Sequence, residues 1–142
     1  MNSWIKAVSL VSLNLFVLMG CTFRHEARLY DYETHAVIPM KAWVKGFQTL
    51  TEAILPTGEH CKGESVSGGG DAESWGDIYS HDDGSARKSL AAIPSSQRRV
   101  MTMACERGTT FDCEYIITTP SYEVEGHGMC RDNGGKYYRL IF

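Results

Sequence analysis

Hydrophobic residues follow one pattern near the N-terminus and another in the rest of the chain. Met1 to Lys6 carries a single cation, and Ala7 to Met19 is an almost continuous apolar run. This run has 13 residues, whereas a membrane-spanning helix needs about 20. A weakly basic start followed by a short apolar run and a small residue is typical of a secretory signal peptide. We therefore expect residues 1–20 to be a signal helix that is removed; a buried N-terminal helix is the alternative.

After residue 27 apolar residues recur at every second position, as in β-strands. In the last segment Tyr138, Leu140 and Phe142 share one face, whereas Tyr137, Arg139 and Ile141 share the other. The preceding Asn133-Gly134 is the strongest short hairpin signal, because both residues tolerate positive φ. The pattern predicts that residues 129–132 pair with residues 136–142.

Further strands are expected upstream of this hairpin. Residues 100–106 and 109–118 should form a second hairpin around Arg107-Gly108. Residues 36–66 should hold two or three more strands, interrupted near Gly46 and at residues 56–58. Pro39 is expected at an edge or bulge, since proline cannot donate to a ladder. Residues 75–79 are a candidate short strand, and residues 85–92 could form one or two helical turns.

These elements predict an all-β fold. The chain has 142 residues, which is the length of a single domain with its own core. We expect a small antiparallel meander barrel or sandwich of six to eight strands, stapled by disulfides. Residues 21–27 are expected to be a tether, and residues 28–142 a single β domain.

The end of the apolar run, Leu18-Met19-Gly20-Cys21, resembles the lipobox of bacterial lipoproteins. The resemblance implies that Cys21 becomes the mature N-terminus and carries a diacylglycerol and an amide-linked acyl chain such as palmitate. Several acyl chains, each contributing ~0.8 kcal/mol per buried methylene, anchor a protein stably. Thr22 follows the cysteine, where Asp would be the inner-membrane retention signal of such lipoproteins. The resemblance therefore implies a periplasm-facing position on the outer membrane, with the cell surface as the alternative.

Four further cysteines follow Cys21: Cys61, Cys105, Cys113 and Cys130. An alternative to lipidation is that Cys21 is itself a fifth structural cysteine. An even number of cysteines in an oxidising compartment predicts disulfides. If Arg107-Gly108 is the turn, Cys113 opposes Thr102, and Cys105 lies three positions away. That is about 10 Å along the strand at ~3.4 Å per residue, beyond the ~7 Å that a disulfide allows between Cα atoms.

Cys113 and Cys130 lie at equal distances from the turn expected at residues 119–123. They should therefore face each other on consecutive strands. This predicts the pairs Cys113–Cys130 and Cys61–Cys105.

We weighed metal and catalytic interpretations and expect neither a metal nor another cofactor. His60, Cys61, His127 and Cys130 could form a zinc site, but the spacing of zinc motifs is missing. His60 and Cys61 are adjacent in a strand and should point to opposite faces. The segment 81–85 (HDDGS) lacks the spacing of a calcium loop. The carboxylate pairs Glu59/Glu64 and Glu123/Glu125 are interpreted as solvated residues rather than as a glycosidase pair, and no G-x-S-x-G motif occurs.

The formal net charge of −3 gives no general reason to expect nucleic-acid binding. Aromatic residues are more numerous than one core of this size requires, and such rings are favoured at interfaces. A surface cluster of them would support a binding role, and complete burial would remove that support. The candidates are Tyr30, Tyr32, Trp43, Phe47, Trp75, Tyr79, Tyr115, Tyr122, Tyr137 and Tyr138.

The segments GEHCKGE, RGTTFDCEY and GHGMCRDNGG loosely resemble small β-rich bacterial lipoproteins that have no assigned activity. We therefore expect a lipid-anchored envelope protein with a binding or structural role and no catalytic residues. Its partners would be the membrane, through Cys21, and a protein of the envelope. The alternatives are an accessory lipoprotein of a secretion, conjugation or exclusion system, and a small envelope hydrolase.

Overall fold

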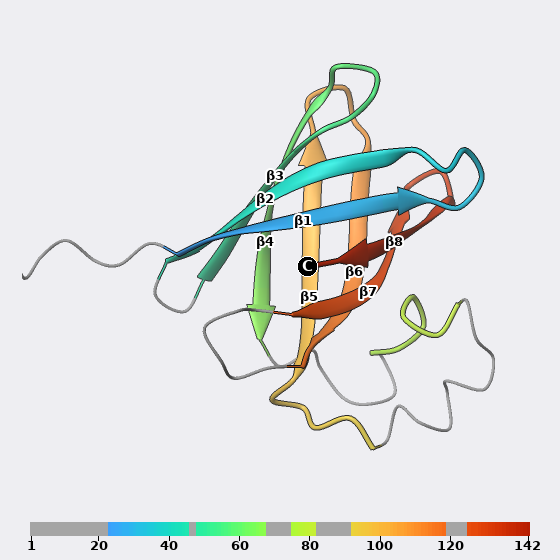
Figure 1. The fold of residues 1–142 in the computed structure, drawn as a ribbon. Coiled ribbons are helices and arrows are strands. Elements are labelled where there is room, and N and C mark those ends of the chain that lie inside the picture. The colour runs from blue at the N-terminus through green and yellow to red at the C-terminus, as the bar shows by residue number, and fades with distance from the viewer. Residues whose placement is uncertain (1–22, 46–47, 68–74, 82–91, 119–124) are drawn as a thin grey trace, which may run out of the picture.

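The computed structural model describes residues 23–45, 48–67, 75–81, 92–118 and 125–142. The fold is a closed antiparallel barrel in which each strand pairs with the next one along the chain and the last pairs with the first (Figure 1). The all-β prediction is confirmed, and the open choice between barrel and sandwich is settled as a barrel. The strands are β1 (Phe23–Asp31), β2 (Val37–Lys45), β3 (Gln48–Ile54), β4 (His60–Ser67), β5 (Arg98–Cys105), β6 (Thr110–Ile117), β7 (Gly126–Asp132) and β8 (Tyr137–Ile141).

The first strand begins earlier than the sequence pattern predicted. Residues 23–27 were expected to belong to a tether, but they form the first half of β1 and pair with β2 from Phe23 opposite Val44 to Ala27 opposite Met40. Arg24 and Glu26 point outward while Ala27 is buried. The alternation therefore extends further towards the N-terminus than the polar residues suggested.

The core fills the inside of the barrel with alternate residues of every strand. Small residues on some strands make room for large ones on their neighbours. A Cβ at Gly63 would collide with Met103, and a Cβ at Gly128 would collide with Tyr115. Phe111 and Tyr138 meet edge to face with ring centroids 5.3 Å apart. Interior packing of this kind is expected of an eight-stranded barrel, whose inside is just wide enough for side chains to fill.

Both predicted disulfides are present inside the barrel. Cys61 lies directly opposite Cys105 on β4 and β5, and Cys113 lies opposite Cys130 on β6 and β7. The Cα atoms are 3.9 Å apart in each bridge. All four cysteines face the core, where their side chains are buried.

The hairpin between β5 and β6 differs by one residue from the predicted register. Cys113 opposes Met101 rather than Thr102. The turn spans three residues, because Cys105 donates its N–H to Thr109, and Gly108 adopts a φ of 93°. Three-residue hairpins with a left-handed glycine are a common alternative to the two-residue turn that was assumed. The distance argument against a Cys105–Cys113 bridge still holds.

One other sequence expectation is wrong. Residues 75–80 form turns rather than a strand, because Glu114 of β6 accepts the N–H groups of Gly76, Ile78 and Tyr79 at 2.8, 3.0 and 2.9 Å. Those N–H groups are thus not available to a sheet ladder. The expectation for Pro39 is confirmed. It pairs with Arg28 of β1, but the β2–β3 ladder begins only at Met40, so Pro39 lies at an unpaired edge of β2 within the described residues.

The expected signal helix, Cys21 and most of the expected helical turn at residues 85–92 lie outside the described residues. No helix in the described part of the chain has the length and apolar character needed to span a membrane.

Candidate binding face

Two adjoining hollows lie on the outer surface of the barrel, where β1 and β8 meet the turns that adjoin them. The first has a volume of about 300 Å³ and the second about 480 Å³. Tyr32 lines both and divides them. The first is lined by Tyr30, Asp31, Tyr32, His35, Arg139 and Ile141, and the second by Tyr32, Glu33, His81, Gly135, Lys136 and Tyr137. We call the residues that line the two hollows the tyrosine face.

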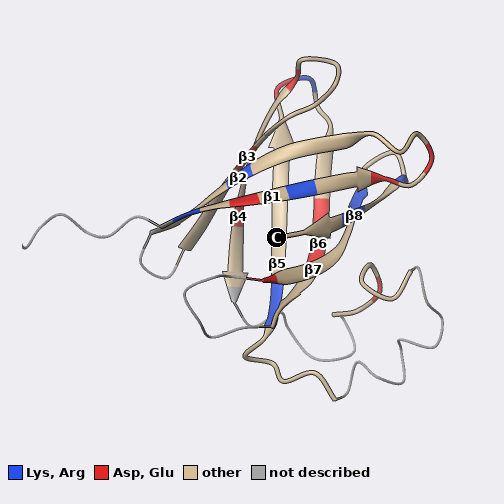
Figure 2. Cartoon of the chain, in the orientation of Figure 1, with Lys and Arg blue, Asp and Glu red and all other residues tan. Residues whose placement is uncertain are grey.

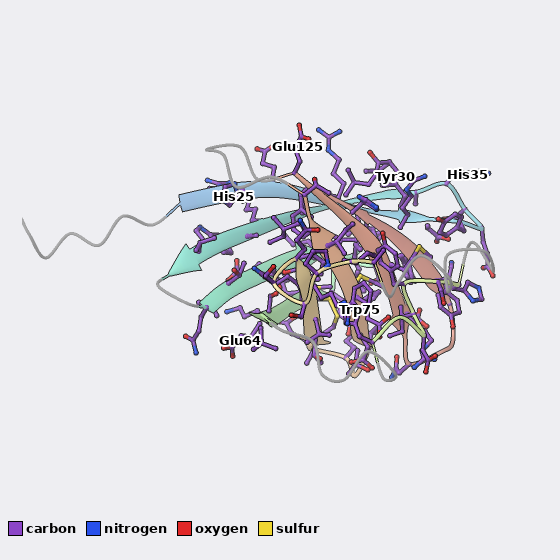
Figure 3. All side chains as sticks on the ribbon, turned by 90° about the horizontal axis from the view of Figure 1, so that it is seen from below. His25, Tyr30, His35, Glu64, Trp75 and Glu125 are labelled. Carbon is purple, nitrogen blue, oxygen red and sulfur yellow. A yellow bond between two sulfur atoms is a disulfide. The ribbon has the colours of Figure 1, made fainter. Side chains whose placement is uncertain are left out.

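The pairing of β1 with β8 brings the strand residues of this face together. Tyr30 lies opposite Arg139, and Arg28 lies opposite Ile141. Successive side chains of a strand point to opposite faces, so these residues point outward while Leu29 and its neighbours fill the core. Figure 3 shows Tyr30 and His35 at the same end of the molecule, where β1 enters its turn.

The turn between β1 and β2 places Tyr32 and His35. The carboxylate of Asp31 accepts the N–H of Glu33 at 2.9 Å and the hydroxyl of Thr34 at 2.6 Å. His35 adopts a left-handed φ of 57° and donates its N–H to the carbonyl of Asp31. Its conformation is uncommon for a residue other than glycine. The hydrogen bonds to Asp31 hold the turn in one shape and fix the backbone position of His35.

An ion pair links Asp31, which lines the first hollow, to Lys136, which lines the second. Lys136 Nζ lies 2.7 Å from Asp31 Oδ2 and 3.4 Å from a carboxylate oxygen of Glu33. Burial by itself would raise the pKa of Asp31, but Lys136, Thr34 and the backbone N–H groups outweigh it and hold that pKa far below its usual value. The hydrogen bond to Asp31 raises the pKa of Lys136. Both groups are therefore charged at neutral pH.

Aromatic rings dominate the walls. Tyr32 is 40% exposed and donates its hydroxyl to the sulfur of Met129 at 3.6 Å. His81 stacks on Tyr137 with ring centroids 3.4 Å apart and an interplanar angle of 1°. Each ring thus keeps a defined position while part of its surface remains accessible. Rigid, amphipathic rings of this kind contribute contact area at a low entropic cost.

A second aromatic–histidine contact lies on the neighbouring strand. Tyr79 Oη and His127 Nε2 are 2.9 Å apart, and the two rings are tilted at 39°. Burial lowers the pKa of His127, and the positive charge of Arg139 lowers it further. Both effects favour the neutral form of the His127 imidazole. Burial also raises the pKa of Tyr79.

Two arginines on this side of the barrel are available to an external group. Arg28 and Arg139 are exposed, and neither makes an ion pair with another described residue. An arginine guanidinium is well suited to binding a carboxylate through two parallel hydrogen bonds. The face thus combines arginine with tyrosine, the residue types enriched at binding hot spots.

The residues of the zinc interpretation are not brought together. Cys61 and Cys130 belong to different disulfides. His60 is exposed while Cys61 is buried, so the two point to opposite faces as expected. Within the described ranges no group of three or more His, Cys, Asp and Glu residues is arranged to hold a metal ion.

The carboxylates weighed as a catalytic pair have separate positions. Glu59 is buried and accepts the N–H of Arg107 at 2.6 Å and the hydroxyl of Thr109 at 3.1 Å, so it joins two turns. Glu64 is exposed on β4. Figure 3 shows Glu64 and Glu125 on different sides of the molecule. Glu123 lies outside the described residues, as do Asp82 and Asp83.

Sequence reasoning identified only part of the tyrosine face. Tyr30, Tyr32 and Tyr137 were among its aromatic candidates, and the alternation of the last strand placed Arg139 and Ile141 on the same face as Tyr137. It missed His35 and His81. The Asp31-x-x-Thr34 spacing is a local signal for the turn that presents His35, because Asp and Thr side chains bond to nearby backbone groups in turns.

Comparison with family models, curated proteins and solved structures finds no match to this chain.

Proposed function

We propose that the protein is a lipid-anchored protein of the cell envelope that binds a partner protein through the tyrosine face. The observation that carries the binding role is the pair of adjoining hollows divided by Tyr32 and lined by three tyrosines. Interfaces between proteins are enriched in aromatic residues and arginine. Because Arg28 and Arg139 lack ion-pair partners in the described part of the chain, the partner surface should carry carboxylates.

The anchoring half of the proposal depends on Cys21. The lipobox resemblance makes it the mature N-terminus, and only Thr22 then separates the lipid from β1. The nine residues of β1 span about 30 Å at ~3.3 Å per residue. Lipid at the start of β1 would leave the tyrosine face at the far end of that strand, where it can meet a partner away from the membrane surface. Thr22 favours the outer membrane, with the barrel in the periplasm.

Replacement of the proposed lipidation site tests the anchor. Cys21→Ser should leave the protein unprocessed or release it from the membrane fraction, because no thiol remains to be acylated. The measurement is the intact mass of the protein in membrane and soluble fractions. Recovery of the variant in the membrane at the mass of the wild-type protein would contradict lipid anchoring.

Site-specific photo-crosslinking in living cells tests the binding role. Benzoylphenylalanine at Tyr32 should give a covalent adduct with one envelope protein, because this position divides the two hollows. The same amino acid at Leu50, which is 42% exposed on β3, is the matched control and should not give that adduct. Arg139→Glu should reduce the adduct at position 32 roughly tenfold, since a carboxylate facing carboxylates is repulsive. Equal adducts at both positions, or none at Tyr32, would contradict the proposal.

A further inference from the structure

Only half of β1 is paired on the side of β8. The ladder joins Arg28–Asp31 to Tyr138–Ile141 and extends no further along β1. The N-terminal half of β1 pairs with β2 alone. Figure 1 shows this half of β1 projecting with β2 and β3 beyond the end of β8. Residues 23–27 therefore present a free strand edge among the described residues.

The backbone groups along this edge can be assigned from the ladder. Asp31 donates its N–H to Ala36 and accepts the N–H of His35, so its backbone groups point towards β2. Hydrogen-bonding direction alternates along a strand, and the β1–β2 register is continuous. Arg24 and Glu26 therefore direct their N–H and C=O groups to the unpaired side. Such an edge is a template for pairing with another strand.

The side chains at the edge have opposite charges. Arg24 and Glu26 are both exposed on the outer face, and Figure 2 shows positive and negative residues alternating along β1. In an antiparallel pair the two residues that exchange hydrogen bonds lie opposite each other, so Arg24 and Glu26 of one chain must face edge-directed residues of the other.

Three such registers are available to a second copy of this chain. In one, Arg24 faces Arg24; in another, Glu26 faces Glu26. Both place like charges directly opposite each other, which is destabilising. In the third, Arg24 faces Glu26 of the second copy, and Glu26 faces its Arg24. This register has His25 on the two-fold axis.

We propose that two copies of the protein associate by antiparallel pairing of residues 23–27 of β1, with His25 on the two-fold axis. The pairing satisfies the free backbone groups of Arg24 and Glu26 and forms two cross-strand ion pairs. It is isologous and closed, as expected of a two-fold dimer. Tyr30 and Tyr32 lie at the other end of β1, so the dimer leaves the tyrosine face uncovered.

Disulfide trapping in the full-length protein, in its native membrane, tests this proposal. Residues 25 of the two copies would be directly opposite each other, with Cβ atoms about 5 Å apart. His25→Cys should therefore give a disulfide-linked dimer on a non-reducing gel. Thr49→Cys, on the neighbouring strand β3 and away from the edge, is the matched control and should stay monomeric.

Charge reversal tests the register. In the His25→Cys background, Arg24→Glu or Glu26→Arg alone should weaken association roughly tenfold, because each turns two attractive pairs into repulsive ones. Co-expression of the two variants should restore the crosslink, since every pair is again complementary. An unchanged dimer in the single variants, equal crosslinking from Thr49→Cys, or capture of a different protein at position 25 would overturn the proposal. The adduct at Tyr32 should be unaffected, so failure here is distinguishable from failure of the binding role.

Discussion

The two ends of the barrel are built differently. At one end the turns after β1, β3, β5 and β7 are short, and buried or half-buried carboxylates hold them. Asp31 fixes the first turn, and Glu59 joins the second to the third. Asp132 accepts the N–H groups of Gly134 and Lys136 and the hydroxyl of Tyr138. Almost every turn at this end is therefore fixed by a charged hydrogen-bond acceptor.

At the opposite end the inward-facing side chains are half-exposed. The hydroxyls of Tyr115 and Ser65 make a neutral hydrogen bond there. The charged guanidinium of Arg99 donates to the carbonyls of Ser96 and Arg98, and no carboxylate takes part in either contact. Thr51, further inside, has a buried hydroxyl without a partner in the described part of the chain. The inward-facing residues at this end are His25, Val44, Thr49, Arg99, Ile117 and Phe142.

The difference agrees with the two proposed roles, partner binding at one end and self-association at the other. Hydrogen bonds to charged groups are worth more than neutral ones, about 1.5–3 kcal/mol against about 1. The end with carboxylate-held turns presents the tyrosine face in a fixed geometry. The other end carries the free edge of β1, where pairing with another strand can satisfy the backbone.

Loss of a disulfide should have the largest effect on this arrangement. The Cys61–Cys105 bridge lies at the end with the short turns and spans 44 residues, whereas Cys113–Cys130 spans 17. In the chain-entropy model the longer loop contributes more, about 4 kcal/mol against about 3. Cys61→Ala/Cys105→Ala should therefore lower the free energy of unfolding by more than Cys113→Ala/Cys130→Ala.

Chemical denaturation of the two double variants under oxidising conditions measures this difference. The wild-type protein in reductant is the control and should lose at least as much stability as either variant. A larger loss from the Cys113–Cys130 pair would show that core packing around the sulfurs, rather than loop length, sets their contribution.

A smaller effect is expected from Asp31→Asn. Loss of the charged acceptor should lower the free energy of unfolding by roughly 2 kcal/mol at pH 7. The pKa of Asp31 in the folded protein is below the usual value of 3.8, which applies to the unfolded chain. The contribution of the Asp31 carboxylate to stability is therefore fully present above about pH 3.8 and is lost as the pH falls below 3.8. The stability difference between wild type and variant should therefore narrow below about pH 4, as measured by denaturation at several pH values.

Tyr115→Phe is the matched control at the opposite end. It removes one neutral hydrogen bond to Ser65 and should lower the free energy of unfolding by about 1 kcal/mol. Its effect should not change between pH 3 and 7, because neither hydroxyl titrates there. A difference for Asp31→Asn that is equally independent of pH would mean that the Lys136 ion pair does not set the acid stability of the turn.

Local signals were sufficient to predict much of the fold. Alternation placed Tyr138, Leu140 and Phe142 on one face of the last strand, and the positions of Cys113 and Cys130 about a turn predicted their pairing. Barrel closure could not be predicted, since it depends on pairing between β1 and β8, the first and last strands. Residues 75–79 were misassigned because their conformation depends on Glu114, a residue far along the chain.

The tyrosine face was only partly predictable for the same reason. Tyr32 contacts Met129, which is 97 positions away, and Tyr30 meets Arg139 only because β8 pairs with β1. Periodicity shows which side of its own strand a residue occupies. It does not show which other strand lies beside it, and so it cannot identify a hollow made by both.

The two disulfides also determine how the protein would bear a mechanical load. They join β4 to β5 and β6 to β7, so these strands form two cross-linked pairs, and β1 lies outside both. If Cys21 carries the lipid as proposed, a pull between membrane and partner enters the barrel through β1. Hydrogen bonds to β2 and to a short stretch of β8 resist that pull. Under tension β1 would detach from β2 and β8 before the disulfide-linked strands separate. The barrel would then open next to its lipid-anchored end.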